Sequence, residues 1–212
     1  MPWRNLSNCV IKLHMEIAKI PLIAGHPALD FLNSVEAHDA PDAKNYLPDY
    51  EHLLRWSVRV GLLRAEQAAR LAEAHHPWLT ESAWAEAMDL RRTLDAIFRA
   101  IAKGKPPPAR ALAAFNATLA TALAHRRISA DLAWDWGEQD DKPDLPAWII
   151  ALSAAELLTD PVRRAQVKVC DNHACDWLFL DESPSSRRRW CRMNVCGNEA
   201  KVRRFRDKRK RA

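Results

Sequence analysis

Residues 170–198 read CDNHACDWLFLDESPSSRRRWCRMNVCGN, and the spacing of their four cysteines determines how the C-terminal part of the chain folds. Cys170 and Cys175 form one close pair, Cys191 and Cys196 form a second pair with the same internal spacing, and 15 residues separate the two pairs. Each pair can fix one edge of a tetrahedron, and the loop between them joins the edges. We therefore expect one structural zinc ion held by four thiolates, with no open position for catalysis.

Two alternatives to this site remain at the level of sequence. A disulfide framework is the first, but residues 1–20 contain no uninterrupted apolar stretch like that of an export signal, so we expect a cytoplasmic protein whose thiols stay reduced. Iron, as a single ion or a cluster, is a weaker second alternative. His173 lies inside the first cysteine pair, and we expect it to lie outside the ligand set because four cysteines are present.

The C-terminal segment is expected to be a small zinc finger, residues 166–212, built from a short β-hairpin and a basic helix. So short a segment cannot bury a large core, and metal binding would supply most of its folding free energy, ~10 kcal/mol or more in small zinc peptides. Trp177 and Phe179 indicate a short strand. After Cys196 the helix is expected to place Val202 and Phe205, three residues apart, against the metal core. Without zinc this segment should unfold.

The positive charge of the chain is concentrated in the same segment. The formal net charge is +5 over the whole sequence, but residues 168–212 contain 13 basic and 6 acidic side chains, which leaves 19 basic and 21 acidic side chains for residues 1–167. A basic helix beside an arginine triplet is typical of proteins that bind nucleic-acid phosphates. A solvated basic tail and a surface for an acidic protein partner are the alternatives. The expected phosphate contacts are Arg187, Arg188, Arg189, Lys201, Arg203, Arg204 and Lys208.

Residues 21–165 are expected to form a mainly α domain, preceded by an N-terminal extension of residues 1–20. Glycines and β-branched residues are few, and alanines and leucines are many. The clearest helix has Thr80 as its N-cap and runs to about Ala102, where Gly104 and three prolines end it, and a partner helix starts near Ala109. Further helices are predicted over residues 50–60, 65–74 and 146–158, and a short β-hairpin over residues 128–136.

A polar cluster near the start of this domain is a candidate ligand pocket. His26, Asp30 and Asn33 alternate with apolar residues, and a helix would place Asp30 and Asn33 on one face. In the alternative interpretation Asp30 caps a helix and the other polar side chains are solvated surface. The sequence has no glycine-rich phosphate loop, nucleophile elbow or His-Glu-x-x-His motif, so we do not expect an enzyme.

Two stretches resemble known families. The Cys-x4-Cys pair, Trp177-Leu-Phe-Leu-Asp181, Arg188-Arg-Trp-Cys191 and Cys196-Gly-Asn198 resemble the CGNR zinc finger, although the arginine of the family's name motif is Glu199 here. His26-Pro-Ala-Leu-Asp-Phe-Leu-Asn33 resembles the opening of the ABATE domain of stress-related transcription regulators. The resemblance implies DNA binding by the finger, with the helical domain as a sensor, and the change at Glu199 puts one phosphate contact of the family in doubt.

The sequence as a whole therefore predicts a cytoplasmic, zinc-containing DNA-binding regulator. Its expected partners are DNA, a small-molecule effector and a second copy of the chain that associates through the helical domain. No membrane contact is expected, because the longest apolar run, residues 145–158, contains Glu156 and is shorter than the ~18 residues that a membrane span needs. The alternative is a helical domain that binds or transforms a small molecule, with the finger as a docking element.

Overall fold

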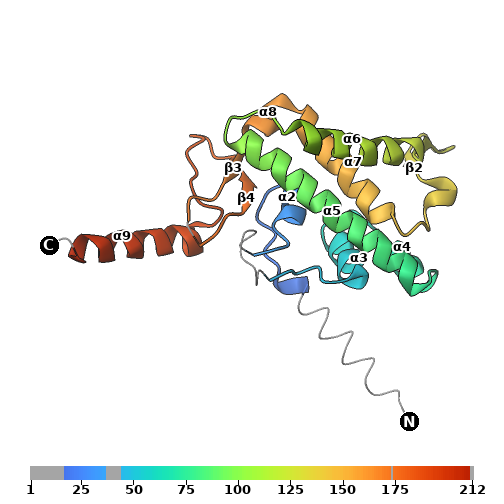
Figure 1. Cartoon of the computed structure of the whole chain (residues 1–212), viewed down its shortest axis with the longest axis horizontal. Coiled ribbons are helices and arrows are strands. Elements are labelled where there is room, and N and C mark those ends of the chain that lie inside the picture. The colour runs from blue at the N-terminus through green and yellow to red at the C-terminus, as the bar shows by residue number, and fades with distance from the viewer. Residues whose placement is uncertain (1–16, 37–43, 173, 211–212) are drawn as a thin grey trace, which may run out of the picture.

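A computed structural model describes residues 17–36, 44–172 and 174–210, and for Lys208 and Lys210 it describes only the backbone. The architecture is mainly α with two short antiparallel hairpins (Figure 1), as the sequence predicted. The interpretation of His173 concerns a residue outside the described ranges. Within those ranges, no helix has the length and apolar character needed to cross a membrane.

The helical body is organised around one long helix, α5 (Pro77–Ala102). Helices α6 (Ala109–Ala124) and α7 (Leu145–Thr159) pack along it, and the short helix α2 (Pro27–Leu32) contacts both α5 and α7 (Figure 1). The remaining elements of the body are α3 (Tyr50–Arg59), α4 (Ala65–Glu73), β1 (Arg127–Ile128), β2 (Trp134–Asp135), a 3-10 turn (Gly137–Gln139) and α8 (Pro161–Ala165).

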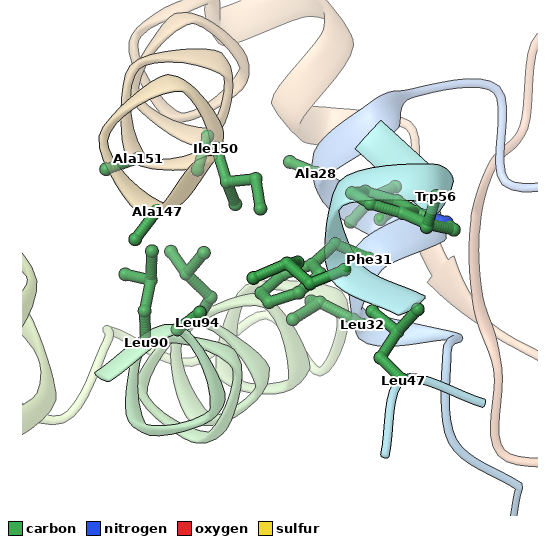
Figure 2. Packing of buried hydrophobic residues seen from close by; sticks show 14 of the residues in the cluster. Ala28, Phe31, Leu32, Leu47, Trp56, Leu90, Leu94, Ala147, Ile150 and Ala151 are labelled. Carbon is green, nitrogen blue, oxygen red and sulfur yellow. The ribbon is translucent and has the colours of Figure 1, made fainter. Parts of the chain in front are cut away.

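Helix α2 lies at the centre of the hydrophobic core. Phe31 and Leu32 project from it toward Leu94 of α5 and Ile150 of α7 (Figure 2), and all four side chains are fully buried. The ring of Phe31 also packs against Trp56 of α3, with 5.4 Å between the ring centroids. A six-residue helix is too short to be stable by itself in water, so these contacts hold it in place.

The ends of the long helix show how local residues set an element's limits. The expectation that Thr80 caps α5 is wrong: the helix begins at Pro77, and the ring Nδ1 of His76 accepts the backbone N–H of Trp78 at 3.4 Å. Proline suits the first position of a helix because its fixed φ is already helical and its missing N–H would have no partner there. The C-terminal end at Ala102 is as predicted, and Gly104 adopts the left-handed φ of 65° beyond it.

Part of the predicted N-terminal extension belongs to the core. Among the described residues of that segment, Ile17 is 4% exposed and Ile20 is 1% exposed. The prediction that residues up to 20 are an extension is therefore wrong from residue 17 onward, because these apolar side chains pack into the helical body.

The finger consists of the hairpin β3 (Val167–Val169) and β4 (Leu178–Leu180), a π-helical turn (Met193–Gly197) and the helix α9 (Asn198–Lys210). Helix α9 extends away from the rest of the molecule (Figure 1). The expectation that Val202 and Phe205 face the metal core is wrong, because they are 49% and 62% exposed. None of the described side chains of α9 is buried, so a spacing of three residues on this helix has no core to pack against.

Candidate metal centre and nucleic-acid interface

The four predicted cysteine ligands come together in space. Their sulfur atoms all lie within 4.8 Å of one another, and the Sγ–Sγ distances from Cys191 to Cys175 and to Cys196 are both 3.6 Å. Zinc–sulfur bonds of ~2.3 Å in a tetrahedron place the sulfurs about 3.8 Å apart. Cys175 is half-buried and the other three are buried. The four residues therefore fit a closed tetrahedral zinc site.

The sulfur atoms of the cluster also influence one another's ionisation. Hydrogen bonding to Cys170 raises the pKa of Cys175 to about 12. Hydrogen bonds with Cys170 and Cys175 raise the pKa of Cys191 well above its usual range, whereas hydrogen bonds with Cys175 and Cys191 lower the pKa of Cys170. Thiols packed this closely cannot all ionise by themselves, since like charges at short range disfavour each other. A zinc ion, when bound, would supply the positive charge that makes four thiolates compatible.

Backbone hydrogen bonds form a tight turn within each cysteine pair, and these turns hold the sulfur atoms in place. The backbone N–H of Cys175 donates to the carbonyl of Asn172 at 2.8 Å, and the N–H of Cys191 donates to the sulfur of Cys170 at 3.4 Å. In the second pair the N–H of Gly197 donates to Arg192 O at 3.1 Å. A Cβ atom at Gly197 would lie 2.4 Å from the sulfur of Met193, so a larger residue would force this turn open.

Helix α9 is tied to the metal-binding loop by a buried asparagine. Asn172 lies between the first two cysteines and is 2% exposed. Its Nδ2 donates to Glu199 Oε2 at 2.6 Å, and its Oδ1 accepts from Arg203 Nη1 at 3.2 Å. Glu199, which replaces the arginine of the family motif, thus anchors the first turn of α9. The helix leaves the finger in a direction that this loop sets.

A buried aspartate organises the loop that carries the arginine triplet. Asp181 is 1% exposed and accepts hydrogen bonds from Lys168, from the hydroxyl and N–H of Ser183 and from the N–H of Arg188. Burial acts to raise its pKa, but the hydrogen bonds from Lys168 and Ser183 outweigh burial and lower the pKa of Asp181 below its usual range. Sequence reasoning missed this role, although Asp181 ends the aromatic stretch quoted for the family resemblance.

Arg188 is a structural residue of the finger. Its guanidinium lies 4.5 Å from the ring centroid of Phe179 and donates to the carbonyls of Leu180, Trp190 and Cys191. A cation over an aromatic face with several carbonyl acceptors is held firmly in one orientation. These contacts use Arg188 to connect β4 with the second cysteine pair, and the arginine is half-buried.

Four of the other predicted phosphate contacts are more open to solvent. Arg187, Lys201 and Arg204 are exposed. Arg189 is exposed but pairs with Asp171, with Nε–Oδ2 at 2.7 Å, and Arg203 is half-buried beside Asn172. The side chain of Lys208 lies outside the described residues. The structure thus brings the candidates onto one module, and among the described residues Arg188, Arg189 and Arg203 have protein partners.

The hairpin of the finger is joined to the helical body through Asn33. The Oδ1 of Asn33 accepts the N–H of Leu178 at 2.9 Å, and its Nδ2 donates to the Leu178 carbonyl at 2.8 Å. The N–H of Leu180 donates to the carbonyl of Ala24 at 2.8 Å. These bonds cover the edge of β4 that β3 leaves open. Val167, Leu178 and Leu180 also belong to the core of the helical body, so the hairpin and the body share one core.

The other two residues of the predicted pocket also bind backbone. His26 Nδ1 accepts the N–H of Ala28 at 3.2 Å and caps α2, while Asp30 Oδ1 accepts the N–H groups of Ile23 and Ala24 at 3.0 and 3.1 Å. Burial, with Arg163 nearby, lowers the pKa of His26 to about 4. Burial raises the pKa of Asp30 to about 6, against the lowering effect of its two backbone hydrogen bonds.

The polar atoms of this motif are therefore committed to the fold. His26, Asp30 and Asn33 are 7%, 8% and 1% exposed, and each binds backbone groups that fix the path of the chain around α2. The interpretation of Asp30 as a helix cap with solvated polar neighbours is wrong, because His26 is the cap, Asp30 lies inside α2 and binds the backbone of the preceding segment, and all three side chains are buried. Asn33 has a role between the body and the finger that the sequence alone did not indicate.

Fold and site together define a helical body that carries a four-cysteine zinc finger with a basic terminal helix. Comparison with known families agrees: the model of the ABATE family, "Putative stress-induced transcription regulator", matches residues 25–161, and the model of the CGNR zinc finger matches residues 166–209. The chain belongs to the ABATE family and ends in a CGNR zinc finger. No match was found among curated proteins.

Proposed function

We propose that this protein is a cytoplasmic, zinc-dependent DNA-binding transcription regulator and not an enzyme. One observation carries the proposal: α9 has seven basic and two acidic residues, stands away from the body, and is fixed at its first turn to the metal-binding loop. A helix of 13 residues is about 20 Å long, and the major groove of DNA is about 12 Å wide, so the groove can admit it.

Each residue of the finger has a distinct part in the proposed mechanism. One zinc ion, when bound, holds the two cysteine pairs together and performs no chemistry on a substrate. Asn172, Glu199 and Arg203 set the direction of α9, and Arg188 holds the loop of the arginine triplet. Phosphates are then contacted by the exposed cations Arg187, Lys201 and Arg204, by Lys208, and by Arg189 after it leaves Asp171.

Salt dependence of binding to duplex DNA tests this function. With about five phosphates neutralised, the logarithm of the affinity falls with the logarithm of salt concentration at a slope of about −4 to −5. Arg204→Gln should reduce the slope by about 1. Arg92→Gln is the matched control, because this exposed arginine lies on α5 and should leave the slope unchanged. A flat salt response, or binding to acidic protein without binding to DNA, would refute the proposal.

We further propose that the helical body senses an effector through the groove between α3 and α4. This groove has a volume of about 560 Å³ and is lined mainly by apolar side chains, among them Ile17, Leu54, Val58, Ala68, Ala69 and Ala72. A cavity of this size and character suits a small organic ligand. Ile17 lies seven residues before Ala24, whose carbonyl accepts a hydrogen bond from Leu180 of β4. A ligand that moves this segment would act on the finger.

The fluorescent apolar anion 1-anilinonaphthalene-8-sulfonate is a suitable probe of the groove. Ala69→Trp should fill the groove and abolish the fluorescence increase on mixing. Ala74→Trp, at an exposed alanine just beyond α4, should leave the increase intact. Equal fluorescence in both variants would show that the dye binds elsewhere and would remove the support for this site.

A further inference from the structure

Helix α9 carries two large apolar side chains on a surface that is otherwise rich in charge. Val202 and Phe205 are 49% and 62% exposed, and the helix around them contains seven basic and two acidic residues. A large apolar side chain in water becomes more stable when another surface covers it. The pair therefore marks a contact surface, and its partner must also suit the surrounding cations.

The two side chains lie on the side of α9 that faces away from the finger. At 3.6 residues per turn, Val202 and Phe205 are about 60° apart around the helix. Ala200 and Arg203 are the half-buried residues among the described side chains of α9, and they lie about 100° to 160° from the pair. Arg203 also binds Asn172 of the metal-binding loop. Because α9 extends away from the molecule (Figure 1), its packing on the finger leaves the pair open to a partner.

Cations border this apolar face on both sides. Lys201 lies about 40° around the helix from Phe205 on one side, and Arg206 lies about 40° from Val202 on the other. Arg209 lies between the two sides, and its guanidinium is 6.0 Å from the ring centroid of Phe205. An apolar centre with cations at both borders suits a polyanion whose charges lie in two rows, with apolar groups between the rows.

Neither acidic residue of the helix interrupts this face. Asp207 lies about 140° around the helix from Val202. Glu199 lies about 60° from Val202, and its carboxylate accepts a hydrogen bond from Asn172. A polyanion that approaches the pair therefore meets the flanking cations first, with Glu199 at one edge of the contact.

We infer that Val202 and Phe205 contact thymine methyl groups in the major groove of DNA, so that this protein prefers neighbouring A·T base pairs. The inference rests on the proposed DNA binding. The major groove is about 12 Å wide and a helix with its side chains is about 10–12 Å across, so cations at both borders can reach the phosphates of the two strands. The centre of the helix face then meets base edges. Thymine presents a methyl group there, whereas the other bases present hydrogen-bonding groups that apolar side chains would leave unpaired.

The spacing of the pair fits neighbouring base pairs. Val202 and Phe205 are about 4.5 Å apart along the helix axis, and stacked base pairs are about 3.4 Å apart. Each methyl group that is removed from water contributes about a fourfold gain in affinity. Two contacts therefore predict a preference of about 15-fold over the same DNA with uracil, which differs from thymine only in lacking the methyl group.

Fluorescence anisotropy of the zinc-loaded full chain tests this contact with two short duplexes. One duplex has alternating dA·dT pairs, and the other has deoxyuridine in place of every thymidine. The wild type should bind the thymidine duplex about 15-fold more tightly. Val202→Ala should reduce this preference to about fourfold, and the double variant Val202→Ala, Phe205→Ala should abolish it. Circular dichroism should report the same helix content for these proteins, because both side chains are exposed.

Salt dependence separates this inference from the proposed function. The double variant should keep the salt slope of the wild type, whereas the matched control Arg204→Gln should lower the slope by about 1 and keep the preference for thymidine. Equal affinity of the wild type for the two duplexes, with salt-dependent binding to both, would overturn the inference and leave the proposed function intact. A preference that survives the double substitution would also overturn it, because other residues or the shape of the DNA would then be the cause. Absence of binding to either duplex would refute both proposals.

Discussion

The two hydrogen bonds between Asn33 and Leu178 yield the most specific prediction for the joint between body and finger. Asn33→Ala removes both partners of a Leu178 backbone that is fully buried. An unsatisfied buried N–H or C=O costs ~1–3 kcal/mol, so the free energy of unfolding should fall by about 2–5 kcal/mol. Guanidinium denaturation of the zinc-loaded protein measures this loss. Hydrogen exchange at residues 178–180 should accelerate to match.

Two further variants separate this joint from general damage. Asn33→Asp keeps the acceptor for the Leu178 N–H but presents a carboxylate to the Leu178 carbonyl, so its destabilisation should be large at neutral pH and should diminish when the carboxyl is protonated. Asn198→Ala removes a single hydrogen bond at an exposed residue and should cost less than about 1 kcal/mol. An Asn33→Ala protein within about 0.5 kcal/mol of the wild type would refute the reasoning, because surface changes produce effects of that size.

Three other outcomes follow from the site. The pKa of His26 is lowered to about 4, so neutral His26 contributes stability that is complete above about pH 6.5 and is lost as the pH falls toward 4. Between pH 7 and 5 the free energy of unfolding of the wild type should therefore fall by about 2 kcal/mol more than that of His26→Asn in denaturation titrations. Equal losses in the two proteins would contradict this assignment. Glu199→Gln should keep the hydrogen bond to Asn172 and remove a negative charge close to the DNA phosphates, so the variant should bind DNA several-fold more tightly in fluorescence anisotropy. Weaker binding would contradict the idea that the Glu199 carboxylate repels the phosphates. Zinc removal should speed amide hydrogen exchange over residues 191–200 and leave residues 178–180 protected, because the helical body still packs against them. Equally fast exchange in both segments would contradict a core shared by the hairpin and the helical body.

Local signals in the sequence predicted the helical body and the metal ligands. The spacing of the four cysteines was sufficient because each pair is close in sequence, and the apolar periodicity of α5 was sufficient because that helix packs along most of its length. The start of α5 was misplaced because Thr80 and His76 are both able to cap a helix, and Pro77 decides between them.

Contacts between distant residues could not be predicted. Asn33 and Leu178 are 145 residues apart, and nothing near either residue indicates the other. Arg188 resembles its neighbours in the arginine triplet, and only the folded loop places it over Phe179. Val202 and Phe205 have helical spacing, but their helix extends into solvent, so their periodicity has no core to match.

The central claim is that one metal ion positions α9 for DNA binding, and titration of zinc into metal-free protein tests it most directly. Binding to a fixed concentration of duplex DNA should be weak at first, rise in proportion to added zinc and reach its limit at one zinc per chain, while Cys191→Ser should stay at the starting value. Full DNA binding before any zinc is added, or full binding by Cys191→Ser, would contradict the account.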